Sequence, residues 1–152
     1  MDRAESLVWL QQRYATLYER ARLDTEDSEE GFGPVIDSAW RLLGAEADAV
    51  IPVSQTNQWE AALDWHALKR VANEYVQRYS KALAGISLQT YQTFQGIMKL
   101  LDLATKRLVA VGLATPDGAG PMYEASYDDL LIRPRRSHVY RTYFLGGATE
   151  YG

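Results

Sequence analysis

The sequence contains no cysteine, and it has only two histidines among its 152 residues. Without cysteine there is no disulfide framework, no thiolate catalysis and no cysteine-ligated metal, and the absence also fits a reducing compartment. The strongest apolar stretches are short and carry charges, so we expect no membrane-spanning segment. Residues 1–5 are polar and lack the apolar core of a secretory signal. These absences favour a globular protein without membrane contact.

What is present is close to the average for a globular chain. Hydrophobic residues make up 47% and charged residues 24% of the sequence, and its length suits one domain with a substantial core. The formal net charge is −4 and the pI is about 5.2. An acidic chain is not attracted to nucleic acid by its overall charge, so only a local basic patch would bind a phosphate backbone.

Apolar residues recur at steps of three and four positions in four stretches, which is the pattern of helices that pack on one another. The predicted helices cover residues 4–23, 34–43, 58–84 and 87–111. This pattern predicts a mainly α fold, an up-down bundle of about four helices. We assign residues 1–113 to this bundle domain and residues 114–152 to an extended C-terminal arm.

Local signals predict where several of these helices begin and end. Pro34 suits the first position of the second helix, because its missing N–H has no helical partner there. Gly44 is expected to end that helix. Asn57 stands three residues before Glu60, which resembles a capping box at the start of the third helix. Ser87 is expected to cap the fourth helix.

A run of acidic residues separates the first two helices. Like charges at this density repel one another, so the pattern predicts a solvated loop. The order of the oxygen donors does not match a calcium-binding loop. A functional alternative is that the run forms an acidic surface that meets a basic surface on another chain. Its members are Asp24, Glu26, Asp27, Glu29 and Glu30.

The C-terminal arm has a different character from the bundle. Turn-forming residues follow Gly112, and residues 128–133 and 138–145 are candidates for extended strands. Residues 134–137 could turn between them to make a β-hairpin. A two-stranded hairpin is marginal in water, so the arm requires a surface to lie on. That surface belongs either to its own bundle or to a partner.

Arginine and aromatic side chains are mixed along this arm. Residues of these types dominate protein interfaces, and they also hold nucleic acid backbones and stack on bases. The acidic composition of the whole chain favours a protein partner. The alternative is that the aromatics only cover their own bundle. The predicted partner-binding residues are Arg133, Arg135, Arg136, Tyr140, Arg141, Tyr143 and Phe144.

No motif in the sequence indicates catalysis. Phosphate-binding and dinucleotide-binding loops and the Gly-x-Ser-x-Gly elbow are all missing, so we predict no enzyme activity, no cofactor and no metal. His66 with Asp64 and Glu60 is the best candidate for an unrecognised polar site. However, their spacing does not match a metal-binding helix, and His66 is expected to be a core or interface residue beside Trp65. Trp65 lies off the best apolar face, and an exposed tryptophan would mark a contact surface.

The layout of residues 57–111 as a long helical pair and residues 128–145 as an arm resembles the head-to-tail connector (adaptor or head completion) proteins of tailed bacteriophages. The resemblance implies a structural virion protein that forms a homo-oligomeric ring. The arm would reach a neighbouring subunit or the portal. Portal, tail and neck proteins would be its partners, and DNA would pass without sequence-specific binding. It also implies a place in the phage neck, after assembly in the host cytoplasm.

An acidic strip at 24–30 and a basic arm at 133–141 would be complementary in a ring, whose contacts join different patches of adjacent subunits. The alternative reading is a small helical protein-binding or regulatory module without catalytic activity. In that case the arm would cover its own bundle.

Overall fold

The computed structural model describes residues 1–46, 48–81 and 87–115, and within this part the chain is helical without any strand. The elements are α1 (Arg3–Arg20), α2 (Ser28–Leu43), a short 3-10 helix (Val53–Gln55), α3 (Thr56–Lys81) and α4 (Leu88–Ala110). The predicted mainly α class with about four helices is therefore confirmed. The predicted arm, its hairpin and the seven partner-binding residues lie outside the described residues.

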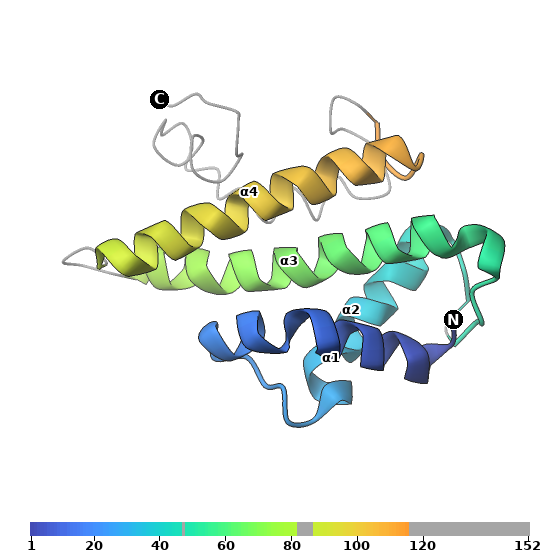
Figure 1. The fold of residues 1–152 in the computed structure, drawn as a ribbon, viewed down its shortest axis with the longest axis horizontal. Coiled ribbons are helices and arrows are strands. Elements are labelled where there is room, and N and C mark those ends of the chain that lie inside the picture. Colours follow the sequence, from blue (N-terminus) through green and yellow to red (C-terminus); the bar gives the residue numbers. More distant parts are fainter. Residues whose placement is uncertain (47, 82–86, 116–152) are drawn as a thin grey trace.

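Helix α3 is the centre of the arrangement, because it packs against each of the other three helices (Figure 1). α3 and α4 form a long antiparallel pair, and α1 lies along the opposite side of α3 (Figure 1). α2 crosses obliquely behind them (Figure 1). None of the described helices is long and apolar enough to cross a bilayer.

Large aromatic residues fill the core between α1, α2 and α3. The rings of Trp40 and Trp59 lie 5.8 Å apart, and Trp59 donates a hydrogen bond of 3.0 Å from its indole nitrogen to the hydroxyl of buried Ser6. Tyr18 packs on Phe32 at 4.6 Å and donates to the carbonyl oxygen of Ala67 at 3.1 Å. The indole N–H of Trp59 and the hydroxyl of Tyr18 each have an acceptor, so their burial leaves no unsatisfied donor.

The start of α2 differs from the prediction. The helix begins at Ser28, and Pro34 lies inside it rather than at its first position. Asp27 caps the helix by accepting hydrogen bonds from the backbone N–H groups of Glu29 and Glu30 at 3.0 and 3.4 Å. Carboxylates in the first turn also interact favourably with the positive end of the helix dipole. The acidic run is therefore a helix start as well as a loop.

The glycine that follows these acids has a packing role. A Cβ on Gly31 would lie 2.2 Å from the carbonyl oxygen of Asp24. The backbone of the α1–α2 connection thus approaches α2 more closely than any side chain would permit.

The start of α3 is also different from the prediction. The expected capping box of Asn57 and Glu60 is not formed, because α3 already begins at Thr56 and continues directly from the 3-10 helix. Thr56 donates a hydrogen bond of 2.8 Å from its hydroxyl to the carbonyl oxygen of Val53. The two predicted boundaries at Gly44 and Ser87 are confirmed. Gly44 has the left-handed φ of 74°, and the Ser87 hydroxyl accepts from the Thr90 N–H at 3.1 Å.

Candidate functional site: a cleft between α1 and α4

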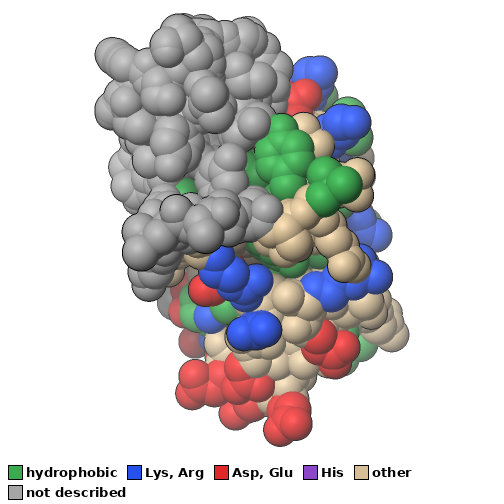
Figure 2. All heavy atoms as spheres, turned by 90° about the vertical axis from the view of Figure 1, so that its left-hand side faces the viewer, with side chains coloured by type: hydrophobic (Ala, Val, Ile, Leu, Met, Phe, Trp, Pro, Cys, Tyr) green, Lys and Arg blue, Asp and Glu red, His purple; other side chains and the backbone are tan. Residues whose placement is uncertain are grey.

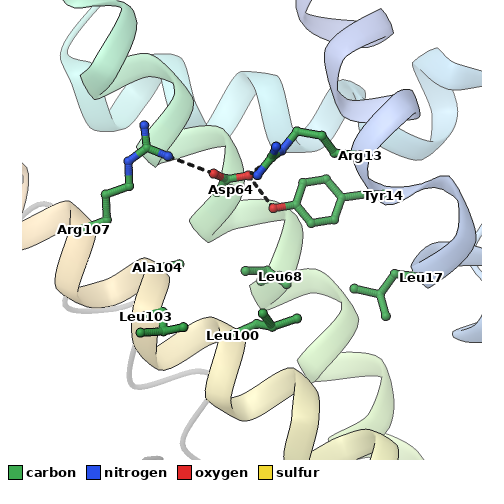
Figure 3. A pocket seen from close by; sticks show the side chains of 9 residues that line it. All are labelled: Arg13, Tyr14, Leu17, Asp64, Leu68, Leu100, Leu103, Ala104 and Arg107. Carbon is green, nitrogen blue, oxygen red and sulfur yellow. Dashed lines mark hydrogen bonds and ion pairs between the residues drawn. The ribbon is translucent and has the colours of Figure 1, made fainter.

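A cleft of about 470 Å³ opens between α1 and α4, with α3 as its floor (Figure 3). It lies where the two outer helices both pack on α3. Arg13, Tyr14 and Leu17 line one wall, and Leu100, Leu103, Ala104 and Arg107 line the other. Asp64 and Leu68 form the floor. The volume is typical of clefts that hold a ligand or a few side chains, roughly 300–1,000 Å³.

One end of the cleft is charged and is organised around Asp64. The Asp64 side chain is only 9% exposed. Its Oδ1 accepts hydrogen bonds from the Arg13 Nε at 3.2 Å and from the Tyr14 hydroxyl, and its Oδ2 accepts from a terminal nitrogen of Arg107 at 3.1 Å. A buried carboxylate requires such compensation, because an unpaired charge in this position would be strongly destabilising. Asp64 therefore ties together three helices.

The arginines at this end remain partly open to solvent. The Arg13 side chain is 50% exposed, and its guanidinium lies over the Trp9 ring at 4.6 Å. The Arg107 side chain is 38% exposed and also lies 3.7 Å from a carboxylate oxygen of Glu60. Because each guanidinium carries five N–H donors, both can take a further acceptor without leaving Asp64.

The other end of the cleft is apolar. Leu17 of α1 lies opposite Leu100 and Leu103 of α4, and Leu68 of α3 lies between them (Figure 3). Leu100 is 48% exposed and Leu103 is 61% exposed, although other large side chains of α4, such as Leu101 and Leu108, are buried. Exposed leucines beside a cleft are typical of a binding surface. The site thus combines a charged end with a leucine-lined end.

The electrostatics of the charged end favour a neutral tyrosine. Burial is the main cause that raises the pKa of Tyr14 far above its ordinary value of 10.0, and the hydrogen bond to Asp64 raises it further. Tyr14 therefore keeps its proton and acts as a hydrogen-bond donor. Desolvation by burial lowers the pKa of Arg13, but the Coulombic attraction and hydrogen bonding of Asp64 and Tyr14 together outweigh it, so that the pKa of Arg13 is raised. Both shifts favour one protonation state of each side chain, a neutral Tyr14 and a positively charged Arg13.

The three residues of the candidate polar site are not brought together. Glu60 and Asp64 both face Arg107, whereas His66 contacts Trp65 with a ring separation of 4.9 Å. Burial lowers the pKa of His66 to about 3, with smaller contributions from the positive charges of Lys69 and Arg41. Its Nε2 is buried without a hydrogen-bond partner among the described residues.

The expectation of a core or interface histidine beside Trp65 fits this geometry. Trp65 itself is fully buried, and its indole nitrogen donates to the Thr105 hydroxyl at 2.9 Å. The idea that Trp65 marks an exposed contact surface is therefore wrong.

All five members of the proposed acidic surface are exposed. Figure 2 views the molecule from the end where α1 finishes, and acidic side chains gather at the bottom of this view. Three of the five also have local structural roles. Asp24 accepts a hydrogen bond from the Glu26 N–H at 2.9 Å, Asp27 caps α2, and Glu29 forms an ion pair with Arg3. The hydrogen bond from Arg3 lowers the pKa of Glu29.

Other chemistry is not found in the part of the chain that the structure describes. No group of three or more metal-ligating side chains lies close together within residues 1–46, 48–81 and 87–115. Comparison of the chain with protein-family models, curated proteins and solved structures finds no match. The fold and the cleft are therefore the observations on which a functional proposal can rest.

Proposed function

We propose that this protein is a non-catalytic structural subunit that assembles with other protein chains, and that the cleft between α1 and α4 holds an extended protein segment. The observation that carries this proposal is the leucine-lined end of the cleft. Leu100 and Leu103 are about half exposed and lie opposite Leu17, with Leu68 between them (Figure 3). Filling a groove of this kind with apolar side chains lowers the free energy, because apolar surface is removed from water.

The charged end supports a binding role over a catalytic one. Asp64 is fully committed to three donors, and the proton of Tyr14 is held tightly. The partly exposed guanidinium groups of Arg13 and Arg107 favour an acidic residue at this end of the groove. They therefore determine the orientation in which a segment binds.

The more specific form of the proposal is a ring-forming connector of the type found between the head and the tail of bacteriophages. Its support is the resemblance of the long helical pair at 57–111 and the arm at 128–145 to those proteins. The exposed acidic surface at 24–30 would meet the basic arm of a neighbour. Ring contacts are heterologous, so two different patches on one chain are what such an assembly needs.

The test is an association measurement on the full chain. Mass photometry and analytical ultracentrifugation at about 0.1–100 µM should reveal concentration-dependent assembly. The double variant Leu100→Asp/Leu103→Asp should weaken association by about tenfold or more while the helical circular dichroism stays unchanged. Val8→Asp is the matched control, because Val8 is 56% exposed on α1 and does not line the cleft.

Two outcomes would reject the assembly proposal. One is a chain that stays monomeric at every concentration, also in the presence of a portal ring. The other is association that the cleft variants leave unchanged. A monomer whose cleft variants lose a bound regulatory partner would instead favour the alternative, a small helical binding module.

A further inference from the structure

The chain continues beyond α4, and it leaves this helix at the charged end of the cleft. α4 ends at Ala110, and the described chain ends at Thr115. Along α4, Arg107 lies nearer to this end than Leu103 and Leu100 do. A segment that follows Thr115 and returns along the cleft therefore meets the arginines first and the leucines second.

The sequence of the arm has the same order of chemistry. Asp128 and Asp129 come first, and they are followed directly by Leu130, Leu131 and Ile132. Two carboxylates would reach the open guanidinium groups of the charged end, and three apolar side chains would then reach the leucine-lined end. Both the charge and the order along the chain are complementary to the cleft.

The connecting length also suits this arrangement. Twelve residues, 116–127, separate Thr115 from Asp128. A flexible chain of this length spans roughly 20 Å on average and about 40 Å at most. The path from the end of α4 back to the level of Arg107 is on the order of 10 Å along the helix axis. A linker whose average reach is comparable to the required span gives a high effective concentration, so a segment of the same chain is favoured over one from a second copy.

We infer that residues 128–132 dock in the cleft of their own chain, with Asp128 and Asp129 at Arg13 and Arg107 and with Leu130, Leu131 and Ile132 at the leucine-lined end. This inference rests on the proposed function of the cleft as a groove for a protein segment, and it identifies the segment. Docking covers Leu100 and Leu103. It also fixes the root of the arm, so that the arginine and aromatic residues from 133 to 144 start from a defined place on the bundle.

The absence of cysteine makes a direct test possible. In the full chain, the pair Leu103→Cys/Leu131→Cys should form a disulfide rapidly under mild oxidation. The pair Val8→Cys/Leu131→Cys is the matched control and should react about tenfold more slowly or not at all. Oxidation of an equal mixture of ¹⁵N-labelled and unlabelled chains distinguishes the source of the segment. Docking within one chain gives only light–light and heavy–heavy peptide pairs, whereas exchange between copies gives hybrid pairs.

Charge reversal tests the orientation. In the Leu103→Cys/Leu131→Cys background, Asp128→Lys/Asp129→Lys should slow disulfide formation by about tenfold. Asp117→Lys, in the connecting segment, should leave the rate unchanged. Equal rates for the cleft pair and the Val8 pair would overturn the inference, and so would mainly hybrid peptides. If the leucine-to-aspartate variants still lose association in that case, the proposed function stands and only the identity of the segment is wrong.

Discussion

Replacing Asp64 with alanine should destabilise the bundle by about 2–3 kcal/mol, because the substitution removes the acceptor that three helices share. Asp64 lies on α3 and accepts hydrogen bonds from Arg13 and Tyr14 of α1 and from Arg107 of α4. Once the carboxylate is gone, the Tyr14 hydroxyl has no acceptor there, and its side chain is 7% exposed. A buried donor without a partner costs roughly 1–3 kcal/mol.

The two arginines add less to this cost. Their side chains are 50% and 38% exposed, so water replaces most of the lost interaction. Partly exposed ion pairs contribute about 0.2–1 kcal/mol each. Alanine has a higher helix propensity than aspartate, which returns about 0.5 kcal/mol. For a chain of this size the net loss corresponds to a decrease in Tm of roughly 5–10 °C.

Urea unfolding at about pH 7, followed by tryptophan fluorescence and circular dichroism, measures this loss. Asp102→Ala is the matched control. Asp102 lies on α4 and pairs with Lys106 at 3.2 Å, but the two side chains are 38% and 72% exposed. That control should lose no more than about 0.5 kcal/mol. Tyr14→Phe completes a double-mutant cycle with Asp64→Ala and should give a coupling energy of about 1–2 kcal/mol. Equal losses for Asp64→Ala and Asp102→Ala would refute the structural role of the network.

Three further predictions concern residues outside the cleft. The pKa of His66 is lowered from 6.5 to about 3 in the folded state, so the unfolded chain takes up this proton first and stability falls as pH decreases below 6.5. His66→Phe should reduce the pH dependence of urea unfolding between about pH 6.5 and 5, whereas His138→Phe serves as the control and should retain it. Gly31→Ala should destabilise the chain by about 1–3 kcal/mol in the same assay, because the added methyl group meets the carbonyl oxygen of Asp24. Gly96→Ala should instead stabilise α4 by about 0.5–1 kcal/mol, because a Cβ there meets nothing within 4 Å. A destabilising Gly96→Ala would show that α4 is more constrained than its open surroundings suggest.

The helices were predictable because apolar residues at steps of three and four positions follow directly from the geometry of a packed helix. The start of α2 was not, because two local signals compete there. The density of like charges and Pro34 both favour a loop followed by a late helix start. The cap at Asp27 and the favourable dipole interaction prevail, and Pro34 is accommodated inside the helix.

The cleft could not be predicted from the sequence, because it depends on tertiary geometry. Arg13 and Arg107 are far apart in the sequence, and the fold brings both of them to the carboxylate of Asp64. The sequence contains one partial signal. Leu100 and Leu103 lie off the regular apolar stripe of α4, and this indicates leucines that the bundle itself does not bury. That these leucines line a cleft is evident only from the structure, which places α1 on the opposite side.

The packing of α4 has a consequence for the order in which the molecule opens. α4 is held mainly by α3, whereas the aromatic core around Trp40, Trp59 and Phe32 is built by α1, α2 and α3. Separation of α4 would expose buried residues such as Phe94, Ile97 and Leu101 but would leave that core closed. Amide protons should therefore exchange in two cooperative groups, those of α4 at a lower opening free energy and those of α3 only on global unfolding. A partner that binds the chain beyond Thr115 consequently acts first on a helix whose packing depends mainly on α3.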